Sequence, residues 1–127
     1  MARTDRHFRY LVRQLTRKAV LFTEMIHTNS ILFGNRNRLD DYFEIENPIV
    51  LQLGGNDPDS LSKVCKMAEH YNYDEINLNL GCPSPKVKSG NFGAALMDHP
   101  ETVQKCLIAM QENSTKNISV KIRLGIN

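Results

Sequence analysis

The sequence predicts an α/β fold in which parallel strands alternate with helices, and the spacing of apolar residues supports this prediction. Apolar residues recur at helical spacing in residues 8–19, 58–70 and 100–112, which is the pattern of amphipathic helices. Four shorter apolar segments are expected to be strands: residues 20–25, 49–53, 75–80 and 118–124. Strands that alternate with helices along a chain are typical of βα units and a parallel sheet.

The first predicted helix, residues 8–19, has an apolar stripe and a basic stripe on roughly opposite sides. The stripes consist of Phe8, Leu11 and Leu15, and of Arg6, Arg9, Arg13 and Arg17. We expect the basic stripe to face solvent, where it is either simply hydrated or in contact with nucleic-acid phosphates. An Arg-rich mitochondrial presequence is a third interpretation, but the apolar stripe runs directly into the first strand, as in a helix of a folded domain.

Three of the four predicted strands, at 49–53, 75–80 and 118–124, combine an apolar face with a more polar face. Lys121 and Arg123 share the polar face of the last strand, and Asn79 and Gln52 lie on the polar faces of two earlier strands. A parallel sheet covered by helices on both sides is apolar on both faces, whereas a (β/α)₈ barrel gathers polar side chains inside, near its mouth. We therefore favour a barrel over an antiparallel sheet with one hydrated face. Gln52, Asn79 and Lys121 are then expected to converge on one site.

The other two predicted helices begin with residues that suit a helix N-terminus. Asp57 precedes Pro58 as an expected N-cap, and Pro100 opens the third helix. Cys65 and Cys106 occupy apolar positions in these helices, so we expect them to be buried thiols of the core.

The long connection at residues 81–99 follows the third strand and is a candidate functional loop. Cys82 lies at its start, between Gly81 and Pro83. This thiol could serve either structural packing or a chemical role, and the residue type alone does not decide between them. Its position at a strand end favours chemistry, because a core thiol gains nothing from such a place.

The composition excludes several classes of protein. The 127 residues suit one domain, and 16 basic against 14 acidic side chains give a net charge of +2, which excludes a bulk polycation. No apolar run is long enough to cross a membrane. The three cysteines form no CxxC pair, so we expect neither a disulfide framework nor a metal site. A reducing, cytoplasmic setting is expected, with a mitochondrion or another organelle left open.

Several motifs resemble those of the tRNA-dihydrouridine synthases, in order and along essentially the whole chain. The segments that carry the resemblance are Arg-Thr-Asp-Arg-His-Phe-Arg at 3–9, Phe-Thr-Glu-Met at 22–25, Leu-Gln-Leu-Gly at 51–54, Asn-Leu-Asn-Leu-Gly-Cys-Pro-Ser at 77–84, Gly-Ala-Ala-Leu-Met at 93–97 and Val-Lys-Ile-Arg-Leu-Gly at 120–125. The segment at 77–84 is the most specific of them. The resemblance is nearest to the A-type enzymes, which act on U20 and U20a in the D-loop of tRNA.

The resemblance implies a flavoenzyme in which FMN, reduced by NADPH, gives a hydride to C6 of a uracil in tRNA. It implies that Cys82 protonates C5, and a free thiol, with a pKa near 8.5, still holds its proton at neutral pH. It places Asn79 at the uracil edge, which an amide can both donate to and accept from. Gln52 and Lys121 match FMN ligands, since a cation stabilises the reduced ring. Arg123 shares their face and is assigned to substrate or tRNA binding.

Residues 1–127 are expected to form part of the family's FMN-binding catalytic domain, as a partial TIM barrel. The family's first strand, the second half of its barrel and its C-terminal helical domain have no counterpart here. Open barrel edges invite self-association. Two other hypotheses remain: a truncated, non-catalytic remnant that binds RNA or a partner, and another FMN barrel such as a dihydroorotate dehydrogenase or enoate reductase. The motif at 77–84 argues against the second.

Overall fold

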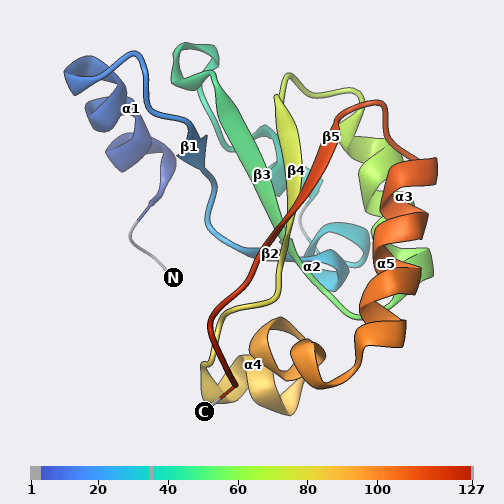
Figure 1. Ribbon diagram of the computed structural model, residues 1–127. Coiled ribbons are helices and arrows are strands. Elements are labelled where there is room, and N and C mark those ends of the chain that lie inside the picture. The colour runs from blue at the N-terminus through green and yellow to red at the C-terminus, as the bar shows by residue number, and fades with distance from the viewer. Residues whose placement is uncertain (1–3, 35, 127) are drawn as a thin grey trace.

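The computed structural model describes residues 4–34 and 36–126, and its centre is a parallel sheet (Figure 1). The strands lie in the order β1 (Leu21–Phe22), β3 (Ile49–Gly54), β4 (Glu75–Asn79) and β5 (Asn117–Lys121). A further short strand, β2 (Ile26–His27), pairs with the end of β3, so β1 and β2 together form one interrupted edge strand. All these pairings are parallel.

Helices connect the strands, and Figure 1 shows α3 and α5 side by side along the sheet. The helices are α1 (Arg6–Leu15), α2 (Thr28–Leu32), α3 (Pro58–Ala68), α4 (Pro85–Ser89) and α5 (Pro100–Glu112), with short 3₁₀ helices η1 (Arg36–Asp40), η2 (Glu44–Glu46) and η3 (Gly93–Asp98). Parallel strands that alternate with helices confirm the predicted fold class, a partial TIM barrel.

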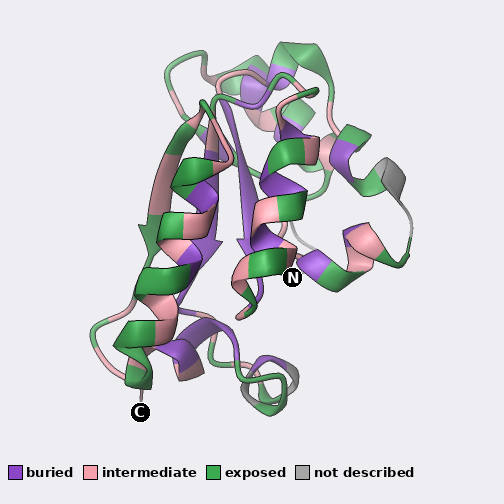
Figure 2. Cartoon of the chain, turned by 90° about the vertical axis from the view of Figure 1, so that its right-hand side faces the viewer, coloured by how far each residue is buried: buried purple, intermediate pink, exposed green. Residues whose placement is uncertain are grey.

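The core lies between the sheet and helices α3 and α5. Every residue of β3 is buried, as are four of the five residues of β4 (Figure 2). The predicted core thiols, Cys65 of α3 and Cys106 of α5, are fully buried. The predicted N-cap is also confirmed, because the Asp57 carboxylate accepts a hydrogen bond from the N–H of Ser60 at 3.0 Å.

The predicted orientation of the first helix is wrong. Arg9 and Arg13 of the basic stripe are buried, whereas the apolar stripe is exposed. The Arg9 guanidinium pairs with the buried Glu46 carboxylate at 2.5 Å, and Arg13 donates to the backbone oxygens of Glu46 and Pro48. Burying a guanidinium is tolerable because its N–H groups find acceptors in the segment at 41–48. The two arginines therefore hold α1 to that segment and cannot contact a nucleic acid.

Two predicted element boundaries also differ from the structure. The segment at 20–25 was expected to be one strand, but β1 ends at Phe22 and β2 begins at Ile26. Between them the Thr23 hydroxyl accepts the N–H of Gln52 at 2.9 Å, in place of a backbone oxygen of the ladder. At the other end of the sheet, β5 stops at Lys121, since its partner β4 ends at Asn79. Arg123 lies beyond the strand.

Candidate active site

A chain of hydrogen bonds connects the polar side chains of three neighbouring strands. The register places Gln52 beside Asn77, and Asn77 beside Ser119. Gln52 Nε2 donates to Asn77 Oδ1 at 2.9 Å, and Asn77 Nδ2 donates to Ser119 Oγ at 2.7 Å. Asn79 Nδ2 donates to Gln52 Oε1 at 3.0 Å. The predicted polar faces therefore do lie on one side of the sheet, and their side chains hydrogen-bond to one another.

The amide of Asn79 also fixes the start of the connection that carries Cys82. Asn79 Oδ1 accepts the backbone N–H groups of Gly81 at 3.1 Å and Cys82 at 2.9 Å. An amide oxygen has two lone pairs and both are used here, while Nδ2 has used one of its two N–H groups, on Gln52. The side chain thus has one N–H group left for a ligand.

Cys82 is half-buried, and residues near the end of the same connection contact its backbone. Its backbone oxygen accepts the N–H of Ala94 at 3.1 Å, and its thiol lies 3.7 Å from the Ser84 hydroxyl. Gly93 has a φ of +63° and lies so close that an added Cβ would be 2.8 Å from the Cys82 oxygen. A glycine is therefore required where the connection folds back on the cysteine.

The rest of the connection is also anchored. Asn56 Nδ2 donates to the backbone oxygen of Asn91 at 3.1 Å, and the Phe92 ring packs edge-on against His27 with 4.6 Å between ring centroids. The long connection thus contains α4 and η3 and is held against the ends of β2 and β3.

The other two thiols contrast with Cys82. Burial raises the pKa of Cys65 to about 12, with a smaller contribution from the negative charge of Glu69. Burial likewise raises the pKa of Cys106 to about 11. Both thiols remain protonated and inaccessible at neutral pH, so Cys82 is the accessible cysteine of the chain.

Cys82 opens onto a hollow of about 290 Å³ at the C-terminal ends of the strands. Gln52, Asn79 and Lys121, the three residues predicted to converge, all line it. Lys121 is exposed there and reaches no acidic partner within ion-pair distance among the described residues. Arg123, the remaining predicted site residue, lies beyond β5 and outside the lining. Three of the residues predicted from the polar strand faces, Gln52, Asn79 and Lys121, therefore lie in one hollow with Cys82.

Residues 23–25 complete this hollow and were not predicted as site residues. They form the break between β1 and β2, where sequence patterning predicts the middle of a strand. The Phe-Thr-Glu-Met motif at 22–25 could have indicated these site residues. A strand that is interrupted beside a polar site commonly directs its side chains into that site.

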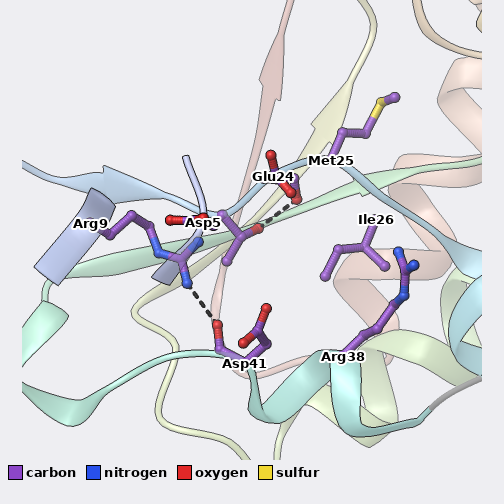
Figure 3. Close-up of a pocket in the computed structure, with 8 residues that line it drawn as sticks. Asp5, Arg9, Glu24, Met25, Ile26, Arg38 and Asp41 are labelled. Carbon is purple, nitrogen blue, oxygen red and sulfur yellow. Dashed lines mark hydrogen bonds between the residues drawn. The ribbon is translucent and has the colours of Figure 1, made fainter. Parts of the chain in front are cut away.

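A second hollow, of about 240 Å³, is lined by the same break (Figure 3). Its lining consists of Thr23, Glu24, Met25 and Ile26 from the break, Asp5 and Arg9 from the start of α1, and Arg38 and Asp41. Arg9 is already committed, because it donates to the backbone oxygen of Asp41 at 2.7 Å and pairs with Glu46. The acidic side chains are engaged as well, because Asp41 pairs with Arg6 at 3.5 Å and Asp5 accepts the N–H of Phe8 at 2.9 Å.

Within residues 4–34 and 36–126, no cluster of His, Cys, Asp and Glu has the geometry of a metal site. None of the described helices has the length and hydropathy needed to span a membrane.

Comparison with known proteins identifies related sequences. A family model described as Dihydrouridine synthase (Dus) matches residues 1–127. A tRNA-dihydrouridine(20/20a) synthase of Synechocystis is 51% identical over 127 residues, which is all of this chain and 38% of that protein. Enzymes of the same name from Vibrio parahaemolyticus and Escherichia coli K12 are each 48% identical over 124 residues. The chain spans less than two fifths of the length of these relatives.

Proposed function

Because the chain belongs to the dihydrouridine synthase family, we propose that it supplies part of the catalytic site of a tRNA-dihydrouridine synthase. The substrate is a uracil of the tRNA D-loop, and positions 20 and 20a are named for the relatives. One observation carries the proposal: the accessible Cys82 thiol opens onto the same hollow as Asn79 and Lys121. A proton donor, an amide and a cation at the C-terminal ends of parallel strands suit chemistry on a planar, polar base.

The residues of the hollow fit a flavin, which is the cofactor we propose. Lys121 offers an ammonium group that makes no ion pair with another described residue, and the Gln52 amide keeps one N–H and one lone pair beyond its bonds to Asn77 and Asn79. A cation and an amide are the groups that hold the polar edge of a flavin ring. When bound, FMN reduced by NADPH would supply the hydride that C6 of the uracil receives. Lys121 would stabilise the negative charge of the reduced ring.

Cys82 is the proposed proton donor. During reduction of the C5–C6 double bond the S–H bond of Cys82 breaks and a C–H bond forms at C5, which leaves a thiolate. Water can return the proton because the side chain is only half-buried. The Cys82 N–H donates to Asn79 Oδ1 and the Cys82 oxygen accepts the N–H of Ala94, so the backbone that carries the thiol is fixed beside the hollow.

Asn79 is proposed to hydrogen-bond to the uracil base through its remaining Nδ2 N–H group. Since both lone pairs of Oδ1 are occupied by Gly81 and Cys82, the amide can donate to a uracil carbonyl oxygen but has no lone pair left for the N3–H group. One residue would then orient both the base and the proton donor.

Contacts to tRNA are proposed at Arg123, which lies past the end of β5, two residues after Lys121. A uracil must leave the folded RNA to reach such a site, and cations near the hollow would hold the displaced backbone. The rival hypothesis of an RNA-binding remnant that uses the basic helix loses support, because Arg9 and Arg13 are buried.

The test is a hybrid enzyme in which residues 1–127 replace the matching segment of the Synechocystis relative. We expect it to retain FMN after desalting and to form dihydrouridine in unmodified tRNA with NADPH. Lys121→Ala should release the flavin during desalting, whereas Lys116→Ala, immediately before the opposite end of β5, should remain yellow.

Three results would contradict the proposal. They are a colourless hybrid that still binds tRNA, a hybrid that reduces orotate or an enone without tRNA, and a Lys121→Ala variant that keeps its flavin and normal turnover.

A further inference from the structure

The hydrogen bonds that connect the polar side chains of the sheet all point in one direction. At the C-terminal ends of the strands, the backbone N–H groups of Gly81 and Cys82 donate to Asn79 Oδ1. Asn79 Nδ2 then donates to Gln52 Oε1 at 3.0 Å, and Gln52 Nε2 donates to Asn77 Oδ1 at 2.9 Å. The series of hydrogen bonds therefore begins with backbone groups that can only donate.

The same series continues away from the hollow and ends on a carboxylate. Asn77 Nδ2 donates to Ser119 Oγ at 2.7 Å, and the Ser119 hydroxyl donates to Glu75 Oε1. Glu75, Asn77 and Asn79 alternate along β4, so they share one face of the sheet. An ionised carboxylate can only accept hydrogen bonds. Both ends of the series therefore require the same direction, and each amide between them has one orientation that satisfies its neighbours.

The orientation of Gln52 decides what this residue offers to a ligand. Its Oε1 faces Asn79, which lines the hollow, whereas its Nε2 faces Asn77, which is not part of the lining. Only one lone pair of Oε1 is used within the protein. Toward the hollow, Gln52 is therefore a hydrogen-bond acceptor that suits an N–H group of the ligand. The polar edge of a flavin ring carries such a group between two carbonyl oxygens.

A reversed Gln52 amide would break the series at two places. Its Nε2 would then face Asn79 Nδ2, and its Oε1 would face Asn77 Oδ1, so that donor would oppose donor and acceptor would oppose acceptor. Gln52, Asn77 and Asn79 are only 7%, 2% and 4% exposed. Buried polar groups that lose their partners cost free energy, because water cannot replace those partners. Asn77 is held against the same reversal by the Ser119 hydroxyl, which Glu75 orients.

We propose that Asn77, Ser119 and Glu75 are positioning residues that keep the oxygen of the Gln52 amide toward the ligand of the hollow. None of the three lines the hollow, so they act through Gln52. The identity of the ligand, FMN, rests on the proposed function, whereas the orientation of Gln52 can be tested without a ligand.

Hydrogen exchange of the Gln52 side-chain amide, followed by NMR in the flavin-free hybrid enzyme, tests the orientation. Ser119→Ala removes the acceptor of Asn77 Nδ2, which allows the Asn77 amide to turn away from Gln52. We expect the Nε2 protons of Gln52 to exchange roughly fivefold faster, as for the loss of one ordinary hydrogen bond. Glu75→Ala should act in the same direction. Ser119→Thr keeps the hydroxyl and should restore the wild-type rate.

Ser114→Ala is the matched control for these variants. The Ser114 hydroxyl also donates to a carboxylate, that of Glu69, at 2.6 Å. It lies in the connection between α5 and β5, outside the series that contains Gln52. This variant loses the same kind of hydrogen bond and should leave the exchange rate of Gln52 unchanged.

Equilibrium binding of FMN to the hybrid enzyme, measured by flavin fluorescence, tests the consequence for the ligand. Ser119→Ala and Asn77→Ala should each weaken FMN binding by roughly fivefold to tenfold. Ser119→Thr and Ser114→Ala should bind FMN like the wild type. Cys82 should react with a disulfide reagent at its wild-type rate in all four variants, because the hydrogen bond of its backbone N–H remains intact. Such a result separates a positioning role from a general loss of structure.

Two results would overturn the proposal. One is a Ser119→Ala variant in which the Gln52 amide exchanges at the wild-type rate. The other is an unchanged FMN affinity in both Ser119→Ala and Asn77→Ala. A wild-type hybrid that binds no FMN would instead contradict the proposed function, and the exchange rates would still decide how Gln52 is held. The two proposals therefore fail separately.

Discussion

Asn79 and Asn77 are two buried asparagines on one face of β4, but only one of them reaches Cys82. Asn79 accepts the N–H groups of Gly81 and Cys82, while Asn77 connects Gln52 with Ser119. The position of the thiol should therefore depend on Asn79 alone.

We predict that Asn79→Ala increases the rate at which a disulfide reagent modifies Cys82 by roughly tenfold, because two hydrogen bonds of about 1 kcal/mol each no longer hold its backbone. Asn77→Ala, the matched control, should leave the rate unchanged. Cys65 and Cys106 report unfolding, since their raised pKa values of about 12 and about 11 keep them unreactive at a pH of about 8 in the native state. Equal rates for the two alanine variants would contradict this role of Asn79.

For individual residues, the sequence predicted which side chains share a face of the sheet, but it did not predict their hydrogen-bond partners. Alternation along a strand is enough to place Gln52, Asn79 and Lys121 on one side. It contains nothing about the amide-to-amide bonds that leave Asn79 with a single N–H group. Those bonds depend on strand register, which long-range packing determines.

Helix α1 depends on a buried ion pair rather than on an apolar stripe. Glu46 is fully buried, binds Arg9 through Oε2 and accepts the N–H of Phe43 through Oε1 at 2.8 Å. Removing one partner of such a pair leaves the other charge buried and uncompensated.

We predict that Glu46→Ala lowers the free energy of unfolding by about 3 kcal/mol or more. Glu44→Ala, two residues earlier in the same short helix and exposed, should change it by less than about 0.5 kcal/mol. Urea denaturation monitored by circular dichroism measures both, with the slope as a check that unfolding stays two-state. Similar midpoints for the two variants would show that the pair does not hold α1 in place.

The orientation of α1 explains why helical periodicity gave the wrong exposed face. Periodicity identifies two opposite stripes, and burial of the apolar one is the usual outcome. Here the buried acceptors for Arg9 and Arg13 come from residues far later in the chain, in the segment around Glu46. Periodicity cannot detect such partners. In contrast, α3 and α5 were predicted well because their apolar stripes pack on the adjacent strands.

At the scale of the whole molecule, the fold brings the ends of β3, β4 and β5 to one hollow, which the first residues of the connection at 81–99 also line. Alternating helices and strands predicted this arrangement, because parallel strands end on the same side of a sheet. Strand patterning alone did not locate the break between β1 and β2, since the break depends on a hydroxyl of Thr23 that replaces a backbone acceptor.

The central claim is that Cys82 donates a proton to a uracil held over this hollow, and one measurement tests it most directly. It is the dihydrouridine content of tRNA after reaction with the hybrid enzyme and with its Cys82→Ala variant. We expect the variant to retain flavin and oxidise NADPH while dihydrouridine formation falls at least about a hundredfold, the usual contribution of a positioned acid. Undiminished product from Cys82→Ala would contradict the account.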